Sequence, residues 1–174
     1  MTTLISSVDS AIQIRPALPQ DSEVVLDILH RATDKLLAKG IKQWTNHCEA
    51  ESIREAIMTG EQFVAAEAGQ LSAVFKLSSK SSNLVVEAAR PGNLYLSQLA
   101  VDPASQNKGV GKMVMARVLQ YADGLGKTLY LDCWAGNTKL KQFYKDCGLE
   151  LLGDFPEEDY FISVFRSPPA ERSS

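Results

Sequence analysis

The middle of the chain reads as a strand, a glycine loop, a helix and a second strand. Residues 93–101, NLYLSQLAV, form the strongest strand pattern, which ends at Asp102-Pro103 because proline cannot continue a strand ladder. From Gly109 to about Gly124 the apolar residues recur at helical spacing, and TLYLDCW at 128–134 is the next strand. A strand–helix–strand unit of this kind constrains the chain to a mixed α/β fold.

The flanking segments supply the other expected elements. Before the central unit we expect a strand at 11–17, a helix from Asp21 or Ser22 to near Gly40, and a short helix that a capping box of Ser52 and Glu55 opens and that ends before Gly60. A hairpin of 62–68 and 71–78 follows. After the central unit we expect a helix that begins at Asn137 or Thr138 and ends at Gly148, and final strands at 149–155 and 159–165. Residues 84–89 extend the hairpin or belong to a loop. The expected order is β-α-α-β-β-β-α-β-α-β-β.

Length and composition predict one domain at 11–166, flanked by polar, disordered ends at 1–10 and 167–174. No apolar run approaches the roughly 20 residues that span a bilayer, so no membrane contact is expected. The first residues lack a basic start and an apolar block, so no signal peptide is expected. The three cysteines read as reduced thiols of a cytoplasmic protein. His30 and His47 are too few and too scattered for a metal cluster.

Charge is unevenly distributed along the chain. The net charge of −3 argues against a nucleic-acid partner. Residues 106–145, however, carry seven basic and two acidic side chains, a local charge of +5 that leaves −8 on the rest. A basic island on an acidic protein favours a small polyanionic ligand, although chance clustering on solvated helix faces gives the same pattern.

The loop at 106–111, Gln-x-x-Gly-x-Gly, has the features of an anion site. The first amides of a helix lack internal partners, and the helix dipole is positive there. Gly109 and Gly111 let the backbone approach an anion closely, and Lys108 and Lys112 add charge. A Walker A loop would need glycine at Gln106, and a Rossmann fingerprint would need a third glycine three residues after Gly111. By itself the loop is equally compatible with a plain helix-starting turn.

Two longer stretches resemble the GNAT N-acetyltransferase superfamily. LSQLAVDPASQNKGVGKMVM is similar to the family's strand end, Q-x-x-G-x-G loop and helix. LDCWAGNTKLKQFYKDCGLELLG is similar to its second motif, N-x-x-L-x-x-F-Y-x-x-x-G, in the family's order and separation. The resemblance implies the acyl-CoA N-acyltransferase fold, with central strands that splay apart at Val101 and Trp134, and acetyl-CoA as co-substrate.

The resemblance also implies roles for individual residues. The main chain of the first central strand would pair with the pantetheine arm, the Leu99 amide would polarise the thioester carbonyl, and Asn137 would bond the arm from the other side. Tyr144 would protonate the leaving thiolate as general acid. The expected coenzyme A ligands are Leu99, Ala100, Val101, Gln106, Asn107, Lys108, Gly109, Val110, Gly111, Lys112, Asn137 and Tyr144. Asn137 is equally suited to a helix N-cap, and Tyr144 to plain packing.

Two departures from the family pattern concern Asn107 and the general base. Many members have glycine where Asn107 stands, and asparagine tolerates the same backbone. Several members use a glutamate on the central strand as base, whereas this chain has Tyr95-Leu96-Ser97-Gln98 there. The candidates for the general base are Asp132, a carboxylate of the late turn, and a water chain held by Tyr95 and Ser97. No base is needed if the amine arrives already neutral.

The acceptor is inferred only as a class. The acidic remainder of the surface favours a small-molecule amine, with the turn of Glu157, Glu158 and Asp159 as one attractor. The candidate substrate-binding residues are Trp44, Tyr95, Ser97, Asp132 and Trp134. A non-catalytic acyl-CoA sensor or partner-binding module and an unrelated nucleotide-binding module are the competing readings. Family members are often dimers, so the resemblance allows a homodimer.

Overall fold

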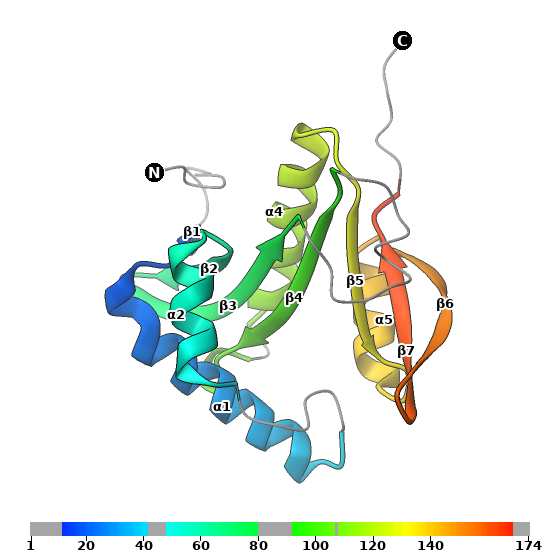
Figure 1. Cartoon of the computed structure of the whole chain (residues 1–174), viewed down its shortest axis with the longest axis horizontal. Coiled ribbons are helices and arrows are strands. Elements are labelled where there is room, and N and C mark those ends of the chain that lie inside the picture. Colours follow the sequence, from blue (N-terminus) through cyan, green and yellow to red (C-terminus); the bar gives the residue numbers. More distant parts are fainter. Residues whose placement is uncertain (1–11, 42–47, 80–91, 107, 169–174) are drawn as a thin grey trace.

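The computed structural model describes residues 12–41, 48–79, 92–106 and 108–168, which form one seven-stranded sheet with helices on both faces (Figure 1). Its strands run in the order β1-β2-β3-β4-β5-β7-β6. The elements are β1 Ile12–Pro16, α1 Ser22–Ala38, α2 Ala50–Met58, β2 Gln62–Glu67, β3 Gln70–Ser78, β4 Leu94–Val101, α4 Val110–Gly124, β5 Leu129–Trp134, α5 Thr138–Asp146, β6 Glu150–Glu157 and β7 Tyr160–Arg166. Short 3-10 turns at Pro19–Asp21 and Pro103–Ser105 precede α1 and follow β4.

The mixed α/β fold and the order of its elements confirm the sequence prediction. The capping box predicted for the second helix is wrong, because Ser52 lies inside α2, whose N-cap is Glu49. Ser167, which the sequence places in the disordered tail, is buried, and it exchanges two hydrogen bonds with Leu129 at 2.8 and 2.9 Å. Residues 1–11, 84–89 and 169–174 lie outside the described residues.

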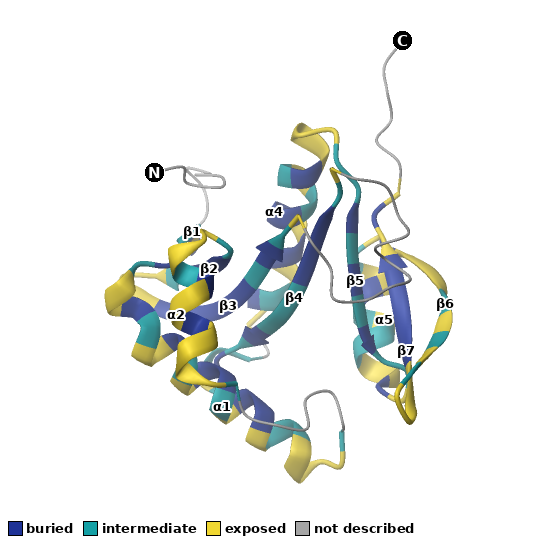
Figure 2. Ribbon diagram, viewed as in Figure 1, coloured by how far each residue is buried: buried dark blue, intermediate teal, exposed yellow. Residues whose placement is uncertain are grey.

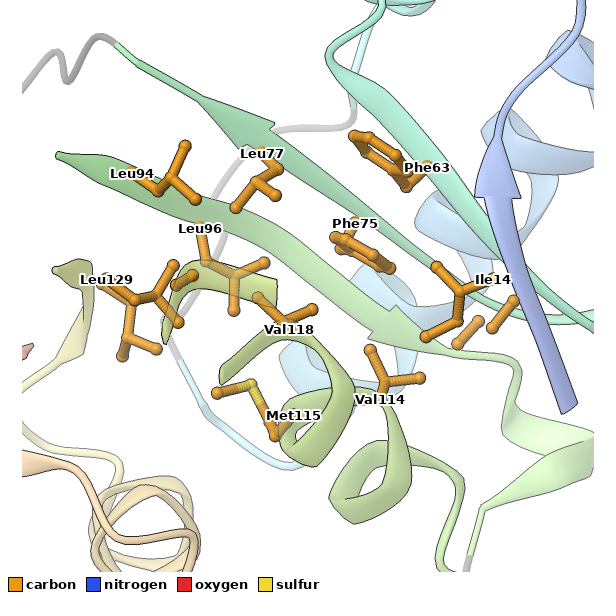
Figure 3. Close-up of a cluster of buried hydrophobic side chains, with 14 of the residues drawn as sticks. Ile14, Phe63, Phe75, Leu77, Leu94, Leu96, Val114, Met115, Val118 and Leu129 are labelled. Carbon is orange, nitrogen blue, oxygen red and sulfur yellow. The ribbon is translucent and has the colours of Figure 1, made fainter. Parts of the chain in front are cut away.

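The two faces of the sheet carry separate apolar clusters. Side chains from the middle strands, including Phe75 and Leu96, pack against α4, which contributes Val114 (Figure 3). On the opposite face, Val25 and Ile28 of α1 pack on Val74 of β3. Figure 2 shows both helices as amphipathic, with their buried side toward the sheet. In the described part of the chain, no helix has both the length and the apolar character needed to cross a membrane.

The sheet opens at its centre, between β4 and β5. These two parallel strands pair only at Leu94–Leu129 and Tyr95–Tyr130, near their first residues. Beyond those two pairs, no further register joins them within the described residues, and Figure 1 shows them diverging toward their carboxyl ends. The predicted splayed strands are therefore confirmed, and the remaining length of β4 keeps one backbone edge without a strand neighbour.

A β-bulge at Gln98 lies within this unpaired stretch. Against β3, Ser97 is opposite Lys76 but Ala100 is opposite Val74, so β4 carries one extra residue here. Gln98 has a φ of 53°, an uncommon value for a residue with a side chain. The extra residue reverses the alternation: Leu96 faces α4, and after the bulge Leu99 rather than Ala100 does so. The bulge therefore determines which face of the sheet each later residue of β4 reaches.

Candidate active site

A cavity of about 640 Å³ is lined by residues of both diverging strands and of three helices. It is bordered by β4, the loop after it, the start of α4, β5, α5, β6 and the C-terminal half of α1. The lining residues used below are Lys35, Lys39, Tyr95, Ser97, Gln98, Leu99, Ala100, Val101, Gln106, Gly109, Val110, Gly111, Lys112, Asp132, Asn137, Phe143, Tyr144 and Glu157.

One wall of this cavity, called the loop wall below, consists of Gln106 and Gly109 through Lys112. Gly109 is the N-cap of α4 and has a φ of 76°, a left-handed conformation that glycine adopts without strain. A Cβ added at Gly111 would lie 3.5 Å from Val101 and from Phe143, an ordinary van der Waals separation, so the helix start packs beside both residues without a steric demand for glycine. The amides of the first turn of α4 have no partner inside the helix and carry its positive dipole, so this wall suits an anion.

Helix α1 is tied to the start of the same loop by two contacts one turn apart. Arg31 donates two bonds, of 2.7 and 3.0 Å, to the buried carboxylate of Asp102. Lys35 donates a 2.6 Å bond to Oε1 of Gln106. Hydrogen bonding from Arg31, outweighing the effect of burial, lowers the pKa of Asp102, so this carboxylate is ionised at neutral pH. The loop therefore holds a fixed position against α1.

Helix α5 brings Asn137 and Tyr144 to the cavity. The Asn137 side chain is buried and accepts a 3.1 Å bond from the Leu140 amide, so it caps α5. Its place on the cavity wall is compatible with a second role in binding. Tyr144 is only 6% exposed, and its ring packs against Phe143 and Phe165 with centroids 5.5 Å apart in each pair. Tyr144 thus combines a fixed ring with a position on the cavity wall.

Burial is the main cause that raises the pKa of Tyr144, and the proximity of Cys133 and Asp132 raises it further. The phenol therefore keeps its proton throughout the neutral range. A protonated hydroxyl on a cavity wall can donate a hydrogen bond or a proton, but it cannot act as a base.

A second wall, called the carboxylate wall below, is formed by Asp132 of β5 and Glu157 of β6. Among the described residues that line the cavity, these two are the carboxylates. Both stand near the phenol of Tyr160, whose pKa is raised first by burial and then by the negative charges of Glu157, Glu158 and Asp132. These carboxylates would attract a cationic group bound in the cavity.

The structure places most of the predicted site residues together on this one cavity. All the described coenzyme A candidates line it except Lys108, which is exposed and absent from the lining. Tyr95, Ser97 and Asp132 line it as well. Trp134 does not, because its ring lies over Gly136, where an added side chain would stand 2.5 Å away. Trp44 and Asn107 lie outside the described residues.

Sequence reasoning missed several residues of the cavity. Gln98 is one of them: its Nε2 lies 3.9 Å from Cys48 Sγ, and its Oε1 is buried without a hydrogen-bond partner among the described residues. Lys35 is another, and no local pattern marks it because its contact lies 71 residues away along the chain. Glu157 was predicted, as a member of the acidic turn that attracts a cationic amine and offers a carboxylate as base. The sequence of this strand does not by itself indicate the positive φ of Gln98.

Comparisons with known proteins agree on one family. The family model described as "Acetyltransferase (GNAT) family" matches residues 28–149. A curated relative, the uncharacterized N-acetyltransferase YesJ of Bacillus subtilis (strain 168), is 31% identical over 150 residues, which cover 79% of this chain and 81% of YesJ.

Solved structures show the same fold at low sequence identity. A GNAT-family acetyltransferase of Streptococcus agalactiae 2603 is 16% identical, with a TM-score of 0.79 over 92% of this chain and 96% of its own. The acetyltransferase yncA of Salmonella typhimurium, solved with its cofactor acetyl-CoA, is 15% identical, with a TM-score of 0.70 over 95% of this chain and 98% of its own. At these identities the likeness concerns the fold.

Proposed function

The chain belongs to the GNAT family of acetyltransferases, and we propose that it transfers an acetyl group from acetyl-CoA to the primary amine of a small molecule. The observation that carries this proposal is that Tyr144 lies on the same cavity as the loop wall and the unpaired edge of β4. A proton donor, an anion site and an open backbone edge are what transfer from a long anionic thioester requires.

The cavity fits the donor by its chemistry. The loop wall offers the amides of a helix start and the cation of Lys112 to a diphosphate. The free edge of β4, from Leu99 to Val101, offers backbone donors and acceptors to the amide groups of the pantetheine arm. Asn137 lines the opposite side. Acetyl-CoA would supply an activated acyl carbon, and the bulge at Gln98 would set the orientation of the Leu99 amide that polarises its carbonyl.

Tyr144 acts in this proposal as the general acid. The acceptor nitrogen forms its bond to the acyl carbon while the carbon–sulfur bond breaks, and the sulfur leaves as a thiolate that takes the phenolic proton. The proton that the nitrogen loses as it becomes an amide passes to the tyrosinate and restores the phenol. The raised pKa of Tyr144 keeps that proton in place until the thiolate forms. Because its ring is held between Phe143 and Phe165, the hydroxyl is positioned before the donor binds.

The carboxylate wall supports a cationic acceptor. An amine is an ammonium ion at neutral pH and must lose a proton before it attacks. Asp132 and Glu157 would attract the ammonium, and Asp132, which is close enough to Tyr144 to influence its pKa, is the carboxylate that we assign as base. This assignment replaces the glutamate that several family members carry on the strand corresponding to β4.

An acceptor screen tests the proposal. Purified protein, acetyl-CoA and a panel of small primary amines, diamines and amino acids would be assayed for thiol release, beside peptides with a free N-terminus or a single lysine. We expect turnover on at least one small amine. Turnover confined to peptides would contradict the small-molecule acceptor but keep the transferase.

The same screen separates an enzyme from a non-catalytic sensor. If the wild type acetylates no amine or peptide although acetyl-CoA binds, the protein is a sensor and not a transferase. If the wild type turns over, a Tyr144→Phe variant that binds coenzyme A but loses much of kcat supports the acid role, and equal rates would remove it. Binding of ATP or NAD in place of acetyl-CoA, read by thermal shift, would contradict both.

A further inference from the structure

We propose that Lys35 of α1 is a direct ligand of the coenzyme A diphosphate, supplied by a helix outside the Gln-x-x-Gly-x-Gly loop. This inference rests on the proposed function, because it needs a coenzyme A thioester in the cavity. Its starting observation is the 2.6 Å bond from Lys35 Nζ to Gln106 Oε1, which holds an ammonium group at the first residue of that loop. Lys35 also lines the same cavity as Gly109, Gly111 and Lys112.

Within the described residues, no carboxylate pairs with the ammonium of Lys35. Its hydrogen-bond partner is the neutral amide of Gln106. Asp102, the carboxylate at the start of the loop, is bound by two nitrogens of Arg31. Because that ion pair satisfies Asp102, Lys35 keeps a full positive charge for an incoming anion.

The ammonium of Lys35 is also held in place before a ligand arrives. The half-buried Lys35 lies one helical turn after Arg31, whose ion pair fixes α1 against the loop. An anion at the start of α4 would meet the Lys35 ammonium on one side and the helix amides on the other, and it would form a charge-assisted bond stronger than the present bond to a neutral amide. Arg31 is a positioning residue in this arrangement.

Lys39 provides a matched control. It is the C-cap of α1, one turn after Lys35, and lines the same cavity, but it is exposed and makes no hydrogen bond to the described residues of the loop. Lys35→Met and Lys39→Met change the net charge equally, so the comparison separates a direct contact from a general field. Thermal unfolding without ligand would verify that both variants fold.

Titration calorimetry with coenzyme A and with dephospho-coenzyme A, which lacks the 3′-phosphate, tests the contact. We expect Lys35→Met to lower the affinity for both ligands by about tenfold and Lys39→Met to lower it by less than about twofold. Lys35→Arg should retain most of the wild-type affinity. The loss in Lys35→Met should shrink as salt rises. Equal losses in the Met variants would overturn the proposal, as would a Lys35→Met loss that disappears with dephospho-coenzyme A.

A double-mutant cycle with Gln106→Ala excludes an indirect effect. If Lys35 binds the diphosphate, Lys35→Met still costs about tenfold in the Gln106→Ala background. If Lys35 only orients Gln106, the second substitution adds nothing, and the proposal is wrong. If the wild-type protein binds neither ligand, the proposed function is wrong as well. If the wild type binds coenzyme A and the Lys35→Met variant binds it with the same affinity, only this inference is wrong.

Discussion

The loop wall and the carboxylate wall line the same cavity but are built in different ways. The loop wall consists of residues close together in sequence whose backbone carries the chemistry, at the start of a 15-residue helix. The carboxylate wall consists of two side chains, Asp132 and Glu157, that come from different strands. A site built from backbone needs only the right local conformation, whereas a site built from side chains changes whenever one residue is replaced.

This difference bears on what each wall recognises. Backbone amides at a helix start suit any phosphate-bearing donor, so the loop wall fits a co-substrate shared by many enzymes. The carboxylate wall fits the acceptor, whose identity differs among enzymes of one fold. The two walls are therefore expected to respond independently to substitution.

The largest expected effect comes from Tyr144→Phe, which removes the proton donor between the two walls. We expect kcat to fall by about a hundredfold because the thiolate must leave unprotonated. The dissociation constant of acetyl-CoA should stay within about twofold, since the phenyl ring keeps its packing against Phe165. Steady-state kinetics and calorimetry on the same preparations measure both quantities. An unchanged kcat would remove Tyr144 from the mechanism.

Gly109→Val should damage the loop wall alone. A branched side chain at a φ of 76° costs roughly 1–2 kcal/mol and distorts the start of α4, so acetyl-CoA binding should weaken by about ten- to thirtyfold. Gly126→Val is the control, because Gly126 has a φ of 68° and nothing within 4 Å of an added side chain, but lies beyond the other end of α4. An equal loss of acetyl-CoA affinity in both variants would mean that global destabilisation causes the effect.

Asp132→Asn should damage the carboxylate wall alone. We expect kcat/KM for the acceptor to fall by about tenfold, as the variant loses both a charge and a base, while acetyl-CoA affinity stays unchanged. Glu158→Gln is a suitable control on the turn beyond Glu157, since Glu158 is exposed and does not line the cavity. A large change in acetyl-CoA affinity would show that the walls are coupled.

The smallest effect concerns the ion pair that ties α1 to the loop. Asp102→Asn should lower the free energy of unfolding by about 1 kcal/mol at pH 7, because Arg31 is 42% exposed and solvent screens the pair. Asp27→Asn, which removes the more exposed partner of Arg31, should cost less.

The pH dependence of this pair has a definite sign. The folded protein lowers the pKa of Asp102 below its ordinary value of about 3.9, so the stabilisation is present above that pH and is lost as the pH falls through the folded-state pKa. Urea unfolding at pH 7 and at several lower pH values should therefore show the wild type and Asp102→Asn converging in acid. A constant difference would contradict the assigned cause.

The same contrast explains what the sequence could predict. Element order, the helix start at Gly109 and the cap at Asn137 depend on residues a few positions apart, so local patterns indicate them. The bulge at Gln98 becomes apparent only in the pairing of β4 with β3. The contact of Lys35 with Gln106 and the placement of Asp132 and Glu157 on one cavity depend on tertiary packing, which no local pattern encodes.

A backbone NMR titration tests the central claim most directly, because that claim concerns amide groups. Wild-type protein labelled with ¹⁵N would be titrated with acetyl-CoA and, separately, with ATP. The account predicts that acetyl-CoA shifts the amides of Leu99, Gly109, Val110 and Gly111 together, saturating at one ligand per chain. Shifts that leave these four amides unchanged and gather elsewhere on the protein, or a response to ATP but not to acetyl-CoA, would contradict it.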